Sequence, residues 1–257
     1  GGEITEGAVD EKIRHSITKM SSLHFTSTDE YRNRVIQMGE FVDTVFSVGA
    51  PGIDNIVNMN LLSKSELEDE LEWKINRTTA LFTFHSETLS KTNSREEIKE
   101  ILKIIDKSNL NILFTYANSD DGGRAINNEI EKFALKDKDR YRVVKSLGQL
   151  KYLSAMKQLD IVIGNTSSGI IESASFQKPV INIGCRQSGR LQSGNVINST
   201  VGNLMESINQ ALSEDFLENL KQKKNIYGDG GAASKIVDLL KCKEISVVKK
   251  FNDFAKG

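Results

Sequence analysis

The chain has 257 residues, 38% of them apolar and 27% charged, and its formal net charge is −1. This composition suits one large hydrophobic core or two smaller ones, and it excludes the basic surfaces that hold nucleic acid or an anionic membrane. Cys185 and Cys242 are far apart without metal-ligand spacing, so we expect no disulfide framework, no metal and a reducing, cytoplasmic location. No stretch approaches the roughly 20 apolar residues that span a bilayer.

The first residues lack an initiator Met and the basic-then-apolar order of a signal peptide. A chain that opens on Gly-Gly-Glu, already inside a motif-like stretch, is expected to be a piece of a longer protein. The elements predicted before residue 79 are a helix at 10–20, a strand at 23–27, a helix at 28–40, a strand and then a turn within 45–56, and a charged, loosely packed surface helix at 64–74.

From Thr79 onward, short β-rich runs alternate with stretches of helical period. The predicted strands cover 79–85, 111–117, 141–146, 160–165 and 179–184. The predicted helices cover 95–108, 122–135, 147–159, 168–176, 204–224 and 232–242. The alternation indicates βαβ units, and therefore an α/β fold with a Rossmann-like parallel sheet and helices on both faces. Such sheets bind ligands at the carboxyl ends of their strands.

The clearest local feature is a strand, a small polar turn and a helix within residues 160–176. The turn consists of Asn165, Thr166, Ser167, Ser168 and Gly169. Small residues let backbone N–H groups approach a ligand, and the following helix N-terminus offers unpaired donors that suit phosphate. Glu172 lies one turn into this helix, where it can accept hydrogen bonds from ribose hydroxyls. An ordinary capped turn is the alternative, because Ser and Thr caps are common.

Polar residues also follow other predicted strands. His85 ends one strand, and Asn118 holds the equivalent position after the next. After the strand at 179–184, Arg186 and Arg190 are both within reach of a phosphate. Each residue alone has an ordinary explanation, as a turn histidine, a capping residue or a surface arginine. Successive strand ends with ligand-capable side chains instead favour a binding site.

Charged side chains crowd into the opening stretch GGEITEGAVDEKIRH. On a helix that begins near Asp10, Asp10 and Arg14 share a face, as do Glu11 and His15. Spacing alone favours acids that complement the helix dipole plus an ordinary ion pair, worth only tenths of a kcal/mol. The Gly-Gly pair before Glu3 instead suits a close-packed active-site loop.

Several long motifs run through nearly the whole chain: GGEITEGAVDEKIRHSITKMSSLHF, SVGAPGIDNI, FHSET, IGNTSSGIIESASFQKPVINIGCRQSGR, SGNVI and IYGDGGAASKI. Through them the chain resembles the hydrolysing UDP-N-acetylglucosamine 2-epimerases of sialic acid biosynthesis. The resemblance implies a GT-B architecture, with the active site between two Rossmann-like domains. Residues 1–22 then end the N-terminal catalytic domain, residues 23–243 form the UDP-binding domain, and residues 244–257 form a C-terminal helix or tail. Roughly the first hundred residues of the family pattern have no counterpart here, a length typical of one small domain.

The reaction implied by this resemblance converts UDP-N-acetylglucosamine and water into N-acetylmannosamine and UDP. It proceeds by anti elimination of UDP and syn addition of water. Glu3 and Asp10 are then the candidate acid and base, and Arg14 orients or charge-balances them. His85 and Arg186 stabilise the departing diphosphate.

The resemblance also assigns the remaining substrate contacts. Glu172 is expected to bind the ribose, and Asn118 to line the cleft. The residues expected to bind phosphate are Thr166, Ser167, Ser168 and Gly169. The expected partner is the UDP-sugar substrate, no cofactor is implied, and a homo-oligomer, dimer or tetramer, is expected. Since the part without counterpart should supply further catalytic residues, this chain alone is expected to bind UDP without turnover.

Two alternatives stay open. The first is a hydrolysing 2-epimerase of another UDP amino sugar, such as UDP-N,N'-diacetylbacillosamine, because the sugar pocket lies largely in the part without counterpart here. The second is a GT-B glycosyltransferase or a UDP-binding module without catalysis. The acids around Glu3 and Asp10 argue against a transferase, because proton abstraction needs carboxylates that glycosyl transfer does not require.

Overall fold

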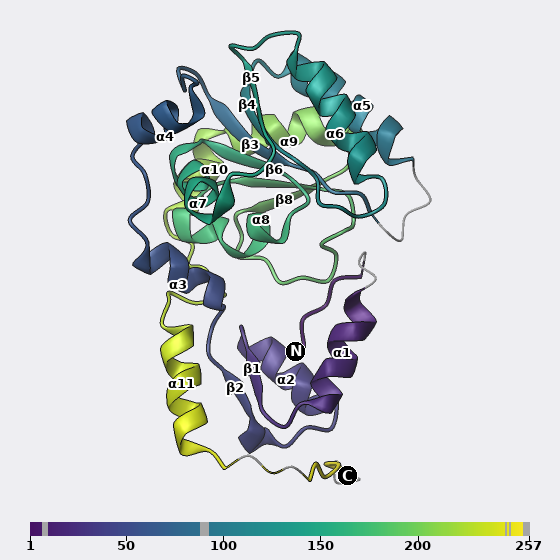
Figure 1. The fold of residues 1–257 in the computed structure, drawn as a ribbon, viewed down its shortest axis with the longest axis vertical. Coiled ribbons are helices and arrows are strands. Elements are labelled where there is room, and N and C mark those ends of the chain that lie inside the picture. The colour runs from purple at the N-terminus through teal and green to yellow at the C-terminus, as the bar shows by residue number, and fades with distance from the viewer. Residues whose placement is uncertain (7–9, 88–92, 245, 247, 254–257) are drawn as a thin grey trace.

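A six-stranded parallel sheet forms the upper part of the molecule (Figure 1). The computed structural model describes residues 1–6, 10–87, 93–244, 246 and 248–253. The strands are β3 (Thr79–Thr83), β4 (Asn111–Thr115), β5 (Tyr141–Val144), β6 (Ile161–Gly164), β7 (Val180–Ile183) and β8 (Val196–Ser199). They lie in the order β5-β4-β3-β6-β7-β8, so the predicted α/β class with a Rossmann-like parallel sheet is confirmed.

Hydrophobic side chains alternate between the two faces of this sheet, as the period of two along a strand requires. On β3, Phe82 packs into a core with helices α5, α6 and α9, while Leu81 packs into a second core with α4 and α7. The helices of the first face are α5 (Ser94–Lys107), α6 (Gly123–Ala134) and α9 (Leu204–Ala211). Those of the second face are α4 (Lys64–Leu71) and α7 (Gly148–Gln158). Helices therefore cover both faces, as predicted.

Two predicted helices, at 168–176 and 204–224, are each divided in the structure. They become α8 (Ser167–Ile171) with the 3-10 turn η2 (Ser173–Phe176), and α9 with α10 (Glu214–Leu220). The second division occurs because the Ser213 side chain accepts a hydrogen bond from the Phe216 N–H and so caps a new helix. Within the described ranges, no helix is both long and apolar enough to cross a membrane.

The turn predicted within 45–56 is the start of a helix, α3 (Pro51–Asn58). Pro51 occupies its first turn, where a missing N–H loses no helical hydrogen bond. The Gly and Pro residues around this position resemble a turn signal, but proline at the first helical position is also a normal beginning of a helix. The prediction was wrong because it interpreted Pro51 only as a turn residue, whereas proline is also common in the first turn of a helix.

Helix α4 is firmly packed, contrary to the prediction of a loose surface helix. Leu67 and Leu71 are 0% and 2% exposed, and Trp73, just beyond the helix, is 6% exposed. The Trp73 indole N–H donates to the Asp139 carbonyl oxygen at 2.8 Å. A few apolar residues on one face thus hold a helix whose other residues are mostly charged.

A smaller unit lies below the main sheet in Figure 1 and is built on two parallel strands. Its elements are α1 (Asp10–Met20), β1 (His24–Thr26), α2 (Asp29–Gln37), the 3-10 turn η1 (Val42–Thr44) and β2 (Val45–Ser47). Helix α11 (Ala232–Cys242) runs beside this unit toward the C-terminus. In the described part of the chain, β1 and β2 pair with each other and not with the main sheet. The predicted domain limits at residues 22 and 243 stay predictions.

The C-terminal tail returns to the smaller unit through a buried carboxylate. Glu40 is 3% exposed and accepts hydrogen bonds from Lys19 Nζ at 2.6 Å and His24 Nε2 at 3.0 Å. Lys249 Nζ of the tail lies 2.8 Å from the same carboxylate. Burial works against ionisation of Glu40, but hydrogen bonds from the two lysines hold its pKa below the ordinary value. One carboxylate thus ties α1, β1 and the tail together.

We expect Glu40→Ala to lower the free energy of unfolding by about 2–3 kcal/mol, because three donors lose their shared acceptor. The control Glu100→Ala removes an exposed ion pair with Lys103 and should cost less than about 0.5 kcal/mol. Urea denaturation followed by circular dichroism measures both values. Equal losses in the two variants would contradict the anchoring role of Glu40.

Candidate active site

The order in which the chain adds strands reverses between β3 and β6, which lie side by side in the sheet. In open α/β sheets, such a switch point opens a crevice at the carboxyl ends of the strands, where ligands bind. Asn165 follows β6 and His85 follows β3, and two hydrogen bonds of 2.8 Å join the Asn165 side chain to the His85 backbone. Gly164, with a φ of 141°, permits this approach, because a Cβ there would lie 1.8 Å from the Thr83 carbonyl oxygen.

The His85 ring has a defined tautomer. Its Nδ1 accepts a hydrogen bond of 3.0 Å from the Asn118 backbone N–H, so the proton of the neutral imidazole sits on Nε2. Burial, and then the nearby Arg186 guanidinium, lower the pKa of His85 to about 4. The Asn118 side chain donates to Asp120 at 2.5 Å. His85 therefore offers a neutral Nε2–H donor, and Asn118 contributes its backbone to this arrangement.

The loop after β7 brings Arg186 to the same place. Arg186 Nη1 and Gln187 Nε2 donate to the Asn165 carbonyl oxygen at 3.2 and 2.9 Å. Burial lowers the pKa of Arg186, and the carboxylates of Asp120 and Asp10 oppose this effect. The predicted residues at three strand ends gather around one asparagine.

The turn predicted to bind phosphate begins helix α8. Thr166 is its N-cap, and the Thr166 Oγ1 accepts a hydrogen bond of 3.0 Å from the Gly169 N–H. This cap uses one of the donors that the prediction assigned to phosphate, and leaves those of Ser167 and Ser168 in the first turn. Because α8 has only 5 residues, its dipole is weaker than that of a long helix.

Glu172 is the C-cap of the short helix α8, whose N-cap Thr166 follows Asn165. It lines a cavity of about 470 Å³, together with Glu3, Arg14 and residues 49–52. Burial raises the pKa of the Glu172 carboxyl. Its Oε2 is buried and has no hydrogen-bond partner among the described residues. Glu172 therefore places a largely buried acid at the wall of a cavity, and the ribose contact predicted for it stays a prediction.

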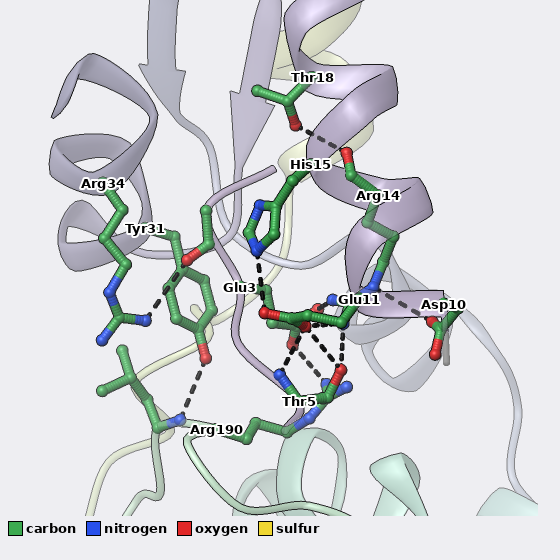
Figure 2. Close-up of polar contacts among 12 residues, drawn as sticks. Glu3, Thr5, Asp10, Glu11, Arg14, His15, Thr18, Tyr31, Arg34 and Arg190 are labelled. Atoms are coloured by element: carbon green, nitrogen blue, oxygen red, sulfur yellow. Dashed lines mark hydrogen bonds and ion pairs between the residues drawn. The ribbon is translucent and has the colours of Figure 1, made fainter. Parts of the chain in front are cut away.

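The predicted acids Glu3 and Asp10 lie on either side of Arg14 (Figure 2). Arg14 Nη1 is 3.4 Å from Glu3 Oε2, and Arg14 Nε is 3.1 Å from Asp10 Oδ2. The same guanidinium donates to Glu11 Oε2 at 2.6 Å and to the Thr5 hydroxyl. One arginine therefore forms ion pairs with three carboxylates at the beginning of helix α1.

Arg190, for which the sequence indicated a phosphate contact, instead forms an ion pair with Glu3 through Nη1. Its side chain is 9% exposed. Beside this pair, the Glu6 backbone N–H donates to the Ser188 carbonyl oxygen at 3.0 Å. The loop that carries Arg186 thus also holds the segment that carries Glu3. It connects the residues around Asn165 with the acids around Arg14.

The Gly-Gly pair before Glu3 is close-packed, as predicted. Gly2 has a φ of 76°, and a Cβ there would lie 2.1 Å from the Tyr31 carbonyl oxygen. Asn165 was predicted as part of the phosphate-binding turn, and Glu11 as an acid that shares a helix face with His15, which it contacts. The structure adds the hydrogen bonds of Asn165 to His85 and of Glu11 to Thr5. Spacing did not reveal these contacts, because each joins segments that only folding brings together.

The arrangement can transfer protons and bind anions. Carboxylates at Glu3 and Asp10 are suited to general acid–base catalysis. The Arg186 guanidinium and the His85 Nε2–H are suited to stabilising a developing negative charge. In the part of the chain that the structure describes, no three His, Cys, Asp or Glu side chains are placed to hold a metal ion.

A Rossmann-like domain with acids and arginines beside its switch point is typical of enzymes that act on nucleotide-linked substrates. Residues 1–241 match the family described as UDP-N-acetylglucosamine 2-epimerase, and the chain belongs to that family.

The chain is similar to curated proteins of known name. It is 43% identical over 220 residues to the GDP/UDP-N,N'-diacetylbacillosamine 2-epimerase (hydrolyzing) of Campylobacter jejuni, covering 85% of this chain and 57% of that relative. It is 37% identical over 258 residues to the polysialic acid biosynthesis protein P7 of Escherichia coli, covering 99% and 65%. It is 33% identical over 241 residues to the UDP-N,N'-diacetylbacillosamine 2-epimerase (hydrolyzing) of Legionella pneumophila, covering 94% and 63%. The chain thus spans 57–65% of the length of these relatives.

Solved structures share the fold. The UDP-GlcNAc 2-epimerase from Neisseria meningitidis bound to UDP-GlcNAc gives a TM-score of 0.75 at 18% identity, covering 91% of this chain and 65% of that one. The S. aureus MnaA–UDP co-structure gives 0.70 at 18% identity, covering 91% and 62%. At these identities, the likeness concerns the arrangement of helices and strands. It supports the GT-B-like architecture that the sequence motifs imply.

We expect His85 to stay neutral down to about pH 4, because burial and Arg186 disfavour its charged form. In the unfolded chain, a histidine takes up a proton near pH 6.5, so the His85 contribution to stability is complete above about pH 6.5 and is lost as the pH falls towards 4. His85→Gln should lack this part of the pH dependence of unfolding. An NMR titration of the ring assigns the value, and a midpoint near 6.5 for the signal that His85→Gln removes would contradict it.

Proposed function

We propose that this chain carries the nucleotide-binding part and much of the active site of a hydrolysing 2-epimerase of a UDP-linked amino sugar. We take UDP-N,N'-diacetylbacillosamine as the preferred substrate. The observation that carries this choice is the 43% and 33% identity to two relatives named as N,N'-diacetylbacillosamine 2-epimerases (hydrolyzing). The acids around Arg14 and the donors around Asn165 supply the two kinds of chemistry that such a reaction needs.

The proposed reaction begins with removal of the proton on C2 of the sugar by a carboxylate. The C2–H electron pair forms the C1=C2 double bond, and the C1–O bond breaks so that UDP leaves with its electron pair. Water then adds syn to the resulting glycal: OH bonds to C1 and a proton bonds to C2 from the same face, which is opposite to the face that lost the original C2 proton. Asp10 suits the proton transfers, since its side chain is 61% exposed and meets Arg14 by a single ion pair. Glu3, held by Arg14 and Arg190, would supply the second acid–base group.

The nucleotide would lie over the crevice at β3 and β6. Arg186 and the neutral Nε2–H of His85 would stabilise the diphosphate as it leaves, aided by the N–H groups of Ser167 and Ser168 in the first turn of α8. Glu172, which lines the cavity shared with Glu3 and Arg14, would accept hydrogen bonds from the ribose hydroxyls. No step of this scheme requires a cofactor.

Hydrolysis of UDP-N-acetylglucosamine to N-acetylmannosamine, in sialic acid biosynthesis, is the second candidate. The 37% identity to the polysialic acid biosynthesis protein P7 of Escherichia coli, over 99% of this chain, favours it. The two substrates differ at C4 and C6 of the sugar, away from the reacting C1 and C2. The expected homo-oligomer and cytoplasmic location stay predictions.

A comparison of kcat/KM for the candidate substrates decides between them. Protein expressed from the complete reading frame is incubated with UDP-N,N'-diacetylbacillosamine, GDP-N,N'-diacetylbacillosamine or UDP-N-acetylglucosamine. We expect kcat/KM to be about 100-fold higher for the first than for the third, because the site would lose hydrogen bonds to the 4-acetamido group. In D₂O, the free sugar product should carry one deuterium at C2.

Each other outcome has a distinct meaning. A preference for UDP-N-acetylglucosamine would establish the second candidate, and a preference for the GDP sugar would correct the nucleotide. Recovery of a UDP-linked epimer in place of free sugar would move the enzyme to a non-hydrolysing reaction. UDP binding at micromolar concentration without turnover of any substrate would reduce it to a binding module.

A further inference from the structure

Two neighbouring acids begin helix α1 and lie in different surroundings (Figure 2). The Asp10 side chain is 61% exposed, and its described contact is with Arg14 Nε at 3.1 Å. The Glu11 side chain is 22% exposed and faces the segment at residues 3–6. The two carboxyl groups therefore cannot have the same task, although they are adjacent in sequence.

Glu11 holds three residues at once. Its Oε2 accepts hydrogen bonds from the Thr5 backbone N–H at 2.8 Å, the Thr5 hydroxyl at 3.1 Å and Arg14 Nη2 at 2.6 Å. Its Oε1 accepts a hydrogen bond from His15 Nε2 at 2.8 Å. Three of these four donors are on Oε2 and one is on Oε1, so most of the acceptor capacity of the carboxylate is used within the protein. Glu11 is thus better suited to holding its neighbours than to taking a proton from a substrate.

The electrostatic surroundings keep Glu11 ionised. Burial works against its charge, but the hydrogen bonds from Thr5 and His15, and the charge of Arg14, hold its pKa below the ordinary value. The ordinary explanation for such an acid is a helix-surface ion pair. The contacts with Thr5 do not fit that explanation, because Thr5 is outside the helix and only 3% exposed.

These contacts hold in place two groups close to Glu3, namely the Arg14 guanidinium and the Thr5 backbone. Through Arg14, Glu11 sets the guanidinium that pairs with Glu3 and Asp10. Through Thr5, it holds the backbone two residues after Glu3. An acid that moved by about 1 Å could cost on the order of 100-fold in rate, so the position of Arg14 matters as much as its charge.

We propose that Glu11 is a positioning residue: it orients Arg14 and the segment around Thr5 so that Glu3 and Asp10 are placed for proton transfer. This inference rests on the 2-epimerase function proposed above. Glu11 acts through Arg14 and Thr5 and has no contact with the substrate in this scheme.

The kinetic test uses the isosteric variant Glu11→Gln in the protein from the complete reading frame. We expect kcat to fall about 100-fold while KM changes less than about threefold, because the nucleotide contacts at His85 and Arg186 are untouched. Glu11→Asp, which keeps the charge, should recover at least about tenfold of the loss. In an Arg14→Met background, Glu11→Gln should lower kcat by less than about threefold further, since its effect passes through Arg14. The control Glu100→Gln should leave kcat unchanged.

A second measurement does not depend on turnover. Hydrogen exchange of the Thr5 amide should quicken about tenfold in Glu11→Gln and stay unchanged in the control, because the acceptor carboxylate is lost. Unchanged Thr5 exchange, or fully additive losses in the Arg14→Met background, would overturn the positioning role. Equal loss of UDP affinity, kcat and thermal stability would show a merely structural one. If the wild type binds UDP without turnover, the proposed function fails, and Thr5 exchange alone decides whether Glu11 orders this segment.

Discussion

The parallel pairing of β3 with β6 determines where this molecule can bind a ligand. Thr83 lies opposite Gly164 in the register, so the two strands end together and the residues that follow them must share one edge of the sheet. The Asn165 side chain joins that edge through two hydrogen bonds to the His85 backbone, and the Asn165 carbonyl oxygen receives Arg186. The donors suited to an anion are therefore consequences of the strand pairing rather than independent features.

The loop after β7 extends this arrangement to the smaller unit. Arg186 reaches the crevice, Arg190 pairs with Glu3, and the Leu191 backbone is held by two buried hydroxyls. The Leu191 N–H donates to the Tyr31 hydroxyl at 3.0 Å, and the Tyr227 hydroxyl donates to the Leu191 carbonyl oxygen at 2.8 Å. This loop therefore joins the crevice to the acid at Glu3 through a continuous series of contacts.

Much of the main sheet could be predicted from the sequence, because buried parallel strands and amphipathic helices leave strong periodic patterns. Prediction was wrong where one residue type is common in two structures: proline occurs both in turns and at the start of helices, and Pro51 begins a helix. His85 could be predicted as a site residue, because strand ends are recognisable in sequence. The ion pair of Arg190 with Glu3 could not be predicted, because folding and not sequence spacing brings the two residues together.

The contrast between Asp10 and Glu11 shows that sequence spacing alone does not distinguish the roles of two adjacent acids. Both acids lie within four residues of Arg14, and helical geometry alone allows either to pair with it. The difference comes from Thr5, whose backbone N–H and hydroxyl both donate to Glu11. Asp10 has only the ion pair with Arg14 among its described contacts, and its side chain is mostly exposed. A carboxylate that accepts hydrogen bonds from several donors is suited to holding other groups in place. A neighbouring carboxylate with free acceptor sites is suited to exchanging protons, so an active site that needs both functions can obtain them from adjacent acids on one helix.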